Sequence, residues 1–479
     1  MIASMPELVS HSPSGGLLPD TVEECHALIG ELTRSQQQLL ARMAALLARM
    51  AALEERLKLS SRTSSKPPSS DGPGQRGGRR PKPPTGRSPG GQPGHKGHWR
   101  EAVAEEALDR IVDCPPSAQC ACGGEVQAHG EPYRHQVFEL PPIKPVVTEY
   151  RCQGGRCTRC GTYQPGPLPA GVPSGQLGPR ALAVIGTLAS QCHVTQHKLT
   201  RALADLFGLR FSVGCVSAAH GKVAEALKPA AAALHEALQA APVKHMDETS
   251  HQCHGGRLWT WTLATHWGAS FHIEPSRGQC AAKEVLGTAP TGILVTDRYA
   301  GYHWVDRAQR QVCWAHLLRD FRRMSQRADL PGALGRALLG MGQWMFRCLH
   351  RGNLAPKVER LQARMHRSLT RGAGQAICDK TARTCRNLLQ LWPALWRFTT
   401  DPAIPPTNNL AERALREVVI HRKISYVTRS GRGMRFVERA YSVVHTCRQQ
   451  ERSAFDFFYD SLDSYFHGPT PQPSLVPSG

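Results

Sequence analysis

The sequence predicts an α/β core followed by a helical segment, on three observations. Between residues 242 and 321, the apolar residues adopt a strand-like pattern with five strands or strand starts. A short helix, "CAAKEVLG", falls between the third and fourth strands, and residues 317 to 400 are helical and rich in Leu, Arg and Ala. Three consecutive strands, then a helix, a strand and a strand-to-helix junction indicate a sheet with mixed pairing. The strands are "VKHMDET", "RLWTWTLATHW", "SFHIEP", "GILVTDRYAGY" and "RQVCWAHLL".

Length and charge indicate several units and a polyanionic partner. A chain of 479 residues is expected to form two to four structural units. Lys and Arg outnumber Asp and Glu by 59 to 38, which gives a net charge of +21. Such an excess favours nucleic acid as the partner, and a basic membrane-surface protein is the alternative. No apolar run approaches the roughly 18 residues that span a bilayer.

The amino terminus, "MIASMPELVSHSPSGG", has no charged region followed by an apolar one, so no secretory signal is predicted. The 16 cysteines are therefore expected to bind metal rather than to form an extracellular disulfide framework.

The first 100 residues predict a helix and a linker. Within residues 1–58, apolar residues repeat at the 4-3 spacing of a coiled coil. The seam residues are Cys25, Ile29, Leu32, Gln36, Leu39, Met43, Leu46, Met50, Leu53 and Leu57. This pattern favours self-association, and a helix packed on the protein's own body is the alternative. Residues 59–100 are rich in Pro, Gly, Ser and basic side chains, which predicts a disordered basic linker able to lie along phosphates.

The cysteine-rich segment, residues 101–170, predicts a zinc site. Its "CTRCG" turn holds Cys157 and Cys160, and "CACGG" holds Cys120 and Cys122 at a less usual spacing. Four thiolates from two such turns would satisfy tetrahedral zinc. Cys114 and Cys152 are alternative ligands, and unligated buried cysteines are the alternative to a metal site.

The remaining segments are helical. Residues 171–240 contain a helix, then Gly208, then Ser212 as a plausible N-cap of a second helix, which resembles helix-turn-helix DNA-binding punctuation. The core is expected to occupy residues 241–320, a helical insertion 321–403, and the carboxyl-terminal part of the core 404–465. A disordered tail is expected over residues 466–479.

Two aspartates are expected to lie side by side in the sheet. Asp247 is predicted at the end of the first strand and Asp297 at the end of the fourth, and these ends meet if the two strands are neighbours. A divalent cation would relieve the repulsion between the two carboxylates, and their oxygen atoms suit Mg²⁺ or Mn²⁺. With a third carboxylate, they could hold two ions and support phosphodiester cleavage and strand transfer.

Glu412, in "PPTNNLAERALR", is the candidate third carboxylate. It lies in the first turn of a predicted helix, where Asn408 and Asn409 could cap the helix or contact phosphate. Arg413 and Arg416 could bind DNA phosphates beside it. The rival acid is Asp401, in a proline-bounded loop, whereas Glu248 is expected on the opposite face of its strand from Asp247. The alternative is that these acids only cap turns or serve the helix dipole.

A set of motifs follows in order from about residue 58 to 465: "SSKPPSSDGP", "GGQPGHKG", "ELPPIKPVVTEYRC", "CTRCG", "MDETS", "TDRYAGY", "CWAHLLRDF", "PTNNLAERALR" and "RFVERAYSVVHTCRQQ". Together they resemble transposases of the insertion sequence 66 family. The first two resemble the amino-terminal linker of that family, the next two its zinc-binding segment, and the others its catalytic core and the part that follows.

This resemblance implies an α/β ribonuclease H-like core with an Asp-Asp-Glu triad at Asp247, Asp297 and Glu412. The triad would bind two Mg²⁺ ions and cut and rejoin DNA at the ends of an insertion element. The family's Cys-x-x-His corresponds to Cys313 and His316, which are expected to support the site rather than to bind a metal of their own. The resemblance also implies small accessory proteins as partners and a cytoplasmic, nucleoid-associated bacterial protein. The one-residue spacing in "CAC" departs from the zinc segment of the family and leaves Cys114 competing with Cys120.

Two other functions fit parts of the sequence. A metal-dependent nuclease could use the same triad without strand transfer, and joining of a free 3′ end to target DNA would separate the two. A zinc-containing DNA-binding regulator would need no triad, yet all three acids and their flanking motifs are intact.

Overall fold

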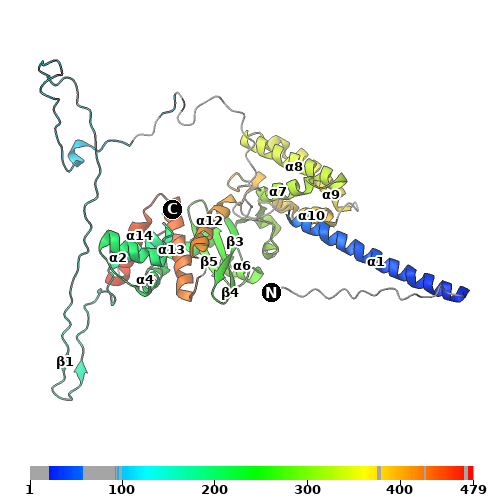
Figure 1. The fold of residues 1–479 in the computed structure, drawn as a ribbon, viewed down its shortest axis with the longest axis horizontal. Helices are drawn as coiled ribbons and strands as arrows, with labels where there is room; N and C mark the ends of the chain where they lie inside the picture. Colours follow the sequence, from blue (N-terminus) through cyan, green and yellow to red (C-terminus); the bar gives the residue numbers. More distant parts are fainter. Residues whose placement is uncertain are drawn as a thin grey trace. The chain divides into compact units, whose positions relative to one another are not determined.

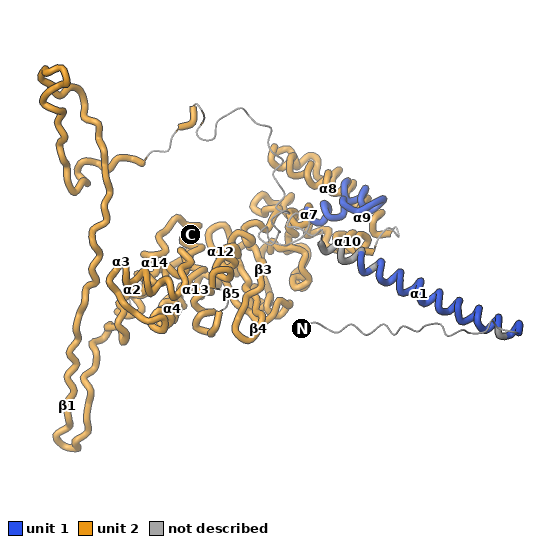
Figure 2. Tube along the Cα trace, viewed as in Figure 1, with its two compact units in different colours: residues 1–78, 319–336 blue, residues 79–318, 337–479 orange. Residues whose placement is uncertain are grey.

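A computed structural model describes residues 21–57, 92, 94–96, 100–374, 379–425, 428–468 and 473–477 (Figure 1). Most of the predicted linker lies outside the described residues. The chain divides into two compact units (Figure 2), one formed by residues 1–78 and 319–336, the other by residues 79–318 and 337–479. Across the described ranges, no helix combines the length and the apolar character needed to cross a bilayer.

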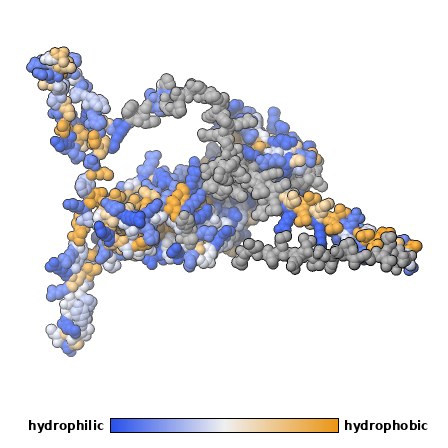
Figure 3. All heavy atoms as spheres, viewed as in Figure 1, coloured by the Kyte–Doolittle hydropathy of each residue, from blue (hydrophilic) through white to orange (hydrophobic). Residues whose placement is uncertain are grey.

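The amino-terminal helix, α1, runs from Val22 to Leu57. Ala, Leu, Met, Arg and Glu, which are good helix formers, fill most of it. Apolar side chains gather along it in Figure 3. Six of the seam residues are more than half exposed, namely Ile29, Leu32, Leu39, Met43, Leu46 and Met50. The helix is as expected, and the coiled coil remains a prediction.

A five-stranded mixed sheet forms the centre of the larger unit, as predicted. Its strands are β3 (Val243–Cys253), β4 (Gly256–Ala264), β5 (Ala269–Glu274), β6 (Ile293–Thr296) and β7 (Arg310–Val312). They lie in the order β5-β4-β3-β6-β7. β3, β4 and β5 pair antiparallel, whereas β6 is parallel to both β3 and β7. The predicted short helix is α6 (Gln279–Leu286), between β5 and β6.

The strand register shows which residues lie on each face of the sheet, and the buried clusters show which helices pack on that face. Asp247 lies opposite Thr262, and Thr262 lies opposite Phe271, so these three side chains point to one face. Phe271 is buried there in a cluster with Leu415 of α12 (Asn409–Ser425) and Tyr441 of α13 (Gly431–Gln449). The other face carries residues such as Met246 and Trp261, which are buried with residues of α5 (Lys228–Ala240) and α6. Asp247 therefore lies on the face that α12 covers.

A helical bundle adjoins the sheet within the same unit (Figure 1). Its members, besides α5 and α13, are α2 (Pro179–Ser190), α3 (Gln196–Phe207), α4 (Val213–Ala226) and α14 (Ala454–His467). The predicted turn is present: Gly208 ends α3 at φ 66°, and the Ser212 hydroxyl accepts a hydrogen bond from the Cys215 N–H at 3.2 Å. However, α4 packs against α2, α13 and α14, and its Val216 and Val223 are fully buried. One face of α4 therefore packs in the bundle, and contact of this helix with DNA stays a prediction.

The predicted helical insertion also contains helices. They are α7 (Trp314–Ser325), α8 (Asp329–His350), α9 (Val358–Gly374), α10 (Asp379–Gln390) and α11 (Trp392–Leu395). Short 3-10 helices occur at η2 (Glu105–Ala107), η3 (Ala300–Tyr302), η4 (Arg307–Gln309), η5 (Ala355–Lys357) and η6 (Arg397–Thr399). In the cysteine-rich segment, β1 (Gly155–Arg156) pairs with β2 (Tyr163–Gln164) around "CTRCG".

Part of the predicted disordered tail contacts the bundle. Leu475 is buried, and its carbonyl accepts a hydrogen bond from the Gln450 side chain at 2.7 Å. The Ser474 carbonyl accepts one from Arg452 at 2.7 Å. Disorder is therefore the wrong prediction for residues 473–477, because Leu475 is buried in the hydrophobic core and two carbonyls accept hydrogen bonds from residues just after α13.

Candidate active site

Three adjacent strands place Asp247, Asp297 and Cys313 in one row. The β3–β6 pairs, Val243–Ile293 to His245–Val295, join residues 50 positions apart, and this offset continued by two residues brings Asp297 next to Asp247. The β6–β7 pairs, which end at Thr296–Val312, are 16 positions apart, and one further step of this offset brings Cys313 next to Asp297. Opposed residues of parallel strands point to the same face. We call these three residues the strand-end row.

The position of Asp247 in its strand differs from the prediction. Asp247 was expected at the end of the first strand, but β3 continues to Cys253 because β4 pairs with it over that length. Asp247 instead lies where the parallel neighbour ends, since β6 stops at Thr296. The expected neighbour, Asp297, follows β6 directly, so the two acids are adjacent even though only one of them ends a strand.

The strand-end row concentrates negative charge. Asp247 is half-buried, and its carboxylate accepts a hydrogen bond from the Glu248 N–H at 2.9 Å. Burial raises the pKa of Asp247 well above its usual range, and the charges of Glu248, Asp297 and Glu412 raise it further. The Asp297 carboxylate accepts the Tyr299 N–H at 2.8 Å. A divalent cation would relieve the electrostatic repulsion at this place.

Glu248 points to the other face, as expected, where its charge is already compensated. Its carboxylate accepts a hydrogen bond from the Tyr302 hydroxyl at 2.6 Å and forms an ion pair with Arg277 at 2.7 Å. Burial raises the pKa of Glu248, and the charge of Asp297 adds to this effect. Glu248 therefore anchors the loop after β6 rather than facing the row.

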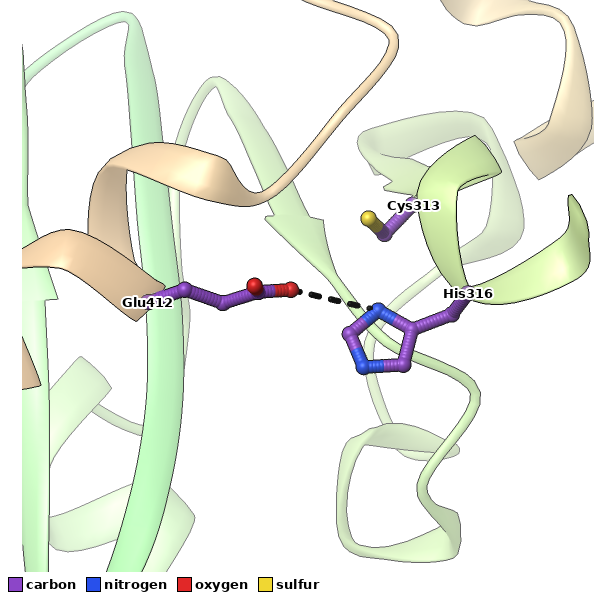
Figure 4. Close-up of side chains that lie close together, drawn as sticks. All are labelled: Cys313, His316 and Glu412. Carbon is purple, nitrogen blue, oxygen red and sulfur yellow. Dashed lines mark ion pairs between the residues drawn. The ribbon is translucent and has the colours of Figure 1, made fainter. Parts of the chain in front are cut away.

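The first turn of α12 carries Glu412 towards Cys313 and His316 (Figure 4). The Oε1 atom of Glu412 lies 3.5 Å from the Nδ1 atom of His316. The Cys313 Sγ, one His316 nitrogen and one Glu412 oxygen all lie within 4.8 Å of one another. In the described part of the chain, no other group of three or more such ligand atoms is this compact, so the predicted triad is less tightly drawn together.

The Cys313 thiol is buried at the end of β7, immediately before α7. Burial raises its pKa to about 11, and the Asn408 N–H, which donates to Sγ at 3.1 Å, acts in the opposite direction. His316, in the first turn of α7, comes from the same Cys-x-x-His motif and lies on the same side of the turn (Figure 4).

The structure gives Asn408 a different role from the predicted contact with DNA. Its side chain is fully buried, and Nδ2 donates to the Met246 carbonyl at 2.9 Å while Oδ1 lies 3.0 Å from the His245 Nδ1. With its N–H on Cys313, Asn408 joins β3, β7 and the start of α12. A buried side chain cannot contact a phosphate in this state. The other three predicted DNA contacts are exposed: Asn409, Arg413 and Arg416.

Arg310 is a supporting residue that the sequence pattern did not reveal. It is fully buried in β7 and donates to the Thr296 hydroxyl at 3.0 Å, the Asp297 carbonyl at 3.1 Å and the Tyr302 carbonyl at 3.1 Å. Burial lowers its pKa to about 10, and the charge of Asp297 acts the other way. A charged residue inside an otherwise buried strand was the one available signal, and it does not identify a partner.

Glu417 anchors the next turn of α12. Its carboxylate forms ion pairs with Arg448 of α13 and with His193, whose Nε2 lies 3.3 Å from Glu417 Oε2. The hydrogen bond with His193, followed by the charge of Arg448, lowers the pKa of Glu417 to about 2. These contacts hold the helix that carries Glu412.

The predicted zinc ligands lie in two separate turns. The six cysteines of this segment, Cys114, Cys120, Cys122, Cys152, Cys157 and Cys160, are all exposed. The Gly124 N–H, followed by the Cys120 thiol, lowers the pKa of Cys122. The Thr162 hydroxyl and N–H, followed by the Cys157 thiol, lower that of Cys160. Each turn favours its own thiolate, and their joint binding of zinc stays a prediction.

Comparisons with known proteins identify a family for most of the core. A model described as "Transposase IS66 family" matches residues 174–436, more than half of the chain. A model of a family of unknown function matches residues 11–101. The chain is also similar to an uncharacterized protein, y4qI, of Sinorhizobium fredii, at 26% identity over 244 residues. That match covers 44% of this chain and 44% of the relative, so the chain spans less than half the length of that curated protein.

Replacing Asn408 with Ala should lower the free energy of unfolding by about 1–3 kcal/mol, because it leaves the buried Met246 carbonyl unpaired. The matched control is Asn409→Ala at the neighbouring exposed position, with an expected change within about 0.5 kcal/mol. Urea denaturation of both variants measures the difference. Equal stability of the two variants would contradict a structural role for Asn408.

The contacts of Glu417 should make the free energy of unfolding depend on pH. Its folded pKa of about 2 lies below the ordinary value of 4.5, so its stabilisation is complete above pH 4.5 and is lost as the pH falls towards 2. Glu417→Gln should therefore reduce the free energy of unfolding at neutral pH by about 2–3 kcal/mol, and the deficit should shrink on acidification. Urea midpoints between about pH 3 and 7 test this, with the exposed Glu236→Gln as control. A deficit that does not change with pH would disprove the ion-pair explanation.

Proposed function

The chain belongs to the IS66 transposase family, and we propose that it catalyses Mg²⁺-dependent DNA cleavage and strand transfer through Asp247, Asp297 and Glu412. DNA is the partner that membership of this family implies. The observation that supports the proposal is the parallel register of β3 and β6, which leads towards Asp247 and Asp297, together with the effect of the Asp297 charge on the pKa of Asp247. We propose that this sheet is the ribonuclease H-like core.

The residues of this face fit Mg²⁺ or Mn²⁺. Asp247 and Asp297 offer carboxylate oxygens, and burial, followed by the charges of neighbouring acids that include Asp297 and Glu412, raises the pKa of Asp247. Glu412, on α12, offers a third carboxylate. When bound, a pair of such ions activates the attacking oxygen and stabilises the leaving oxygen of a phosphodiester.

The protein's own contribution is to hold the acids and the DNA in place. Arg310 fixes the backbone at Asp297, and Asn408 fixes the start of the helix that carries Glu412. Exposed Arg413 and Arg416 on that helix are suited to bind phosphates beside the acids. We propose that they and Asn409 contact DNA, whereas the excess of basic residues over the whole chain adds non-specific attraction.

Two further proposals concern the amino-terminal part. The exposed apolar seam of α1 would associate with a second copy of the chain, which would bring two active sites to the two ends of an element. The cysteine turns would bind Zn²⁺ through Cys120, Cys122, Cys157 and Cys160, with Cys114 and Cys152 as alternates. The turns fit such an ion because two of the thiolates, Cys122 and Cys160, are already favoured within them. Small accessory proteins of the same element remain proposed partners.

The proposed triad predicts loss of catalysis with DNA binding retained. Purified protein would be mixed with a labelled duplex carrying the element's own end, a target plasmid and Mg²⁺. Asp297→Asn and Glu412→Gln should each reduce cleavage and joining at least 100-fold because a metal-binding carboxylate is lost. The matched control is Asp401→Asn, an exposed loop acid outside the site, which should react as wild type does.

Each outcome of that assay selects one function. Joined product from wild type, and none from the triad variants, supports the transposase proposal. Cleavage without joining would favour a nuclease, and wild-type rates in Asp297→Asn would refute the triad. DNA binding with no reaction, even with the accessory proteins added, would favour a regulator.

Self-association through α1 predicts that substitutions in its seam lower the mass of the assembly in solution. Leu39→Gln with Leu46→Gln should reduce self-association because both are seam positions, while Gln keeps the helix propensity near that of Leu. The matched control is Leu40→Gln with Leu47→Gln, which are similarly exposed but lie off the seam. Light scattering measures the mass. An unchanged mass in the seam variant, or an equal loss in both, would contradict the coiled coil.

A further inference from the structure

We propose that Cys313, His316 and Glu412 form a binding site for a zinc-type transition-metal ion, which shares only Glu412 with the proposed magnesium site. This goes beyond the supporting role expected for the Cys-x-x-His motif. The three donors are a sulfur, an imidazole nitrogen and a carboxylate oxygen, and all lie within 4.8 Å of one another. The inference does not rest on the proposed reaction, because metal binding is a property of these three residues alone.

The spacing of the donors fits a tetrahedral ion. Bonds of about 2.0–2.2 Å from zinc to nitrogen and oxygen place the two ligand atoms roughly 3.4 Å apart at a tetrahedral angle. The His316 Nδ1 to Glu412 Oε1 distance is 3.5 Å, so this pair needs almost no movement. The Cys313 sulfur lies within 4.8 Å of one nitrogen of His316 and of one oxygen of Glu412.

The chemistry of the donors selects the metal. A thiolate and an imidazole suit zinc or cobalt, whereas Mg²⁺ prefers oxygen ligands throughout. Three protein ligands also leave one tetrahedral position for water or another oxygen, as in catalytic zinc sites. The donor set therefore differs in kind from the all-carboxylate set proposed for magnesium.

The fold holds the ligands from two helix starts. Cys313 immediately precedes α7, and His316 lies in its first turn, so both point to one side of that turn (Figure 4). Glu412 lies in the first turn of α12. Asn408 connects the two, because its N–H donates to the Cys313 sulfur and its carbonyl accepts the Glu412 N–H at 3.2 Å. Such outer hydrogen bonds orient metal ligands before the ion arrives.

Glu412 would then serve two sites. Cys313 is the end of the strand-end row and, by the continued β6–β7 offset, lies next to Asp297. A zinc-type ion on one Glu412 oxygen would fix this carboxylate next to the row and leave the second oxygen for the magnesium site. The position of the third acid would thus depend on a softer metal beside it, which makes Cys313 and His316 positioning residues.

The test is metal binding by the full chain in the absence of DNA. A background with Cys120, Cys122, Cys157 and Cys160 all replaced by Ser removes both amino-terminal turns that could also bind metal. After metal removal and addition of Co²⁺, this protein should bind about one equivalent and show thiolate-to-cobalt charge-transfer absorption. Zinc content after dialysis gives the same stoichiometry by a second method.

Variants assign the ligands. In that background, His316→Ala and Cys313→Ser should each lose the equivalent, and Cys313→Ser should also lose the thiolate absorption. His316→Cys should retain the ion and strengthen the absorption, an effect that a purely structural role would not produce. The matched control is Cys385→Ser, which removes an equally buried thiol whose pKa burial also raises to about 11. Circular dichroism confirms that each variant folds.

The outcomes separate this inference from the proposed reaction. A background protein that binds no equivalent, or a His316→Ala variant that keeps it, overturns the metal site. Strand transfer by a protein without the ion would then still support the transposase proposal. Conversely, a bound equivalent that depends on Cys313 and His316 supports the metal site even if no joined product forms.

Discussion

The candidate site depends on one buried amide. Asn408 bonds to the backbone of β3 through its side chain and to the sulfur of Cys313 through its N–H. These contacts join the strand that carries Asp247, the strand that ends at Cys313 and the helix that carries Glu412. An amide is suited to this task because it donates and accepts at once, and burial makes any unpaired group costly. A different arrangement of these three elements would leave at least one of those groups unsatisfied.

The parallel strand register acts together with the hydrogen bonds of Asn408 to arrange the site. It aligns Asp247, Asp297 and Cys313 on neighbouring strands, so carboxylates far apart in the sequence become neighbours without any loop to place them. The helices of the insertion separate Cys313 from Glu412 along the chain, and the closure entropy of such a long connection grows only slowly with its length. An insertion can therefore be accommodated between the last strand and α12, provided that Asn408 returns the chain to β3.

The sequence predicted the sheet well because its strands carry local signals. Alternating apolar residues and the short helix before β6 were sufficient to place five strands, whereas the meeting of Asp247 and Asp297 was expected only if the first and fourth strands were neighbours. The length of β3 was harder, since it depends on the hairpin with β4 rather than on β3 itself. The roles of Asn408 and Arg310 depend on partners distant in sequence, so no local pattern distinguishes a buried amide from an exposed phosphate contact. The same limit applies to α4, whose helical punctuation is clear but whose burial comes from α2, α13 and α14.

Glu412 lies where two kinds of metal chemistry meet. Its oxygens are hard ligands that suit magnesium, yet a thiol and an imidazole lie close to one of them. A carboxylate has two oxygens, so it can belong to both environments only if each oxygen faces a different one. The row of strand ends supplies this geometry in principle, because Cys313 borders Asp297 and the acids extend away from it along the sheet. In that arrangement the soft ligands would not compete with the proposed triad for magnesium. Cys313 and His316 would instead determine the position of the Glu412 carboxylate.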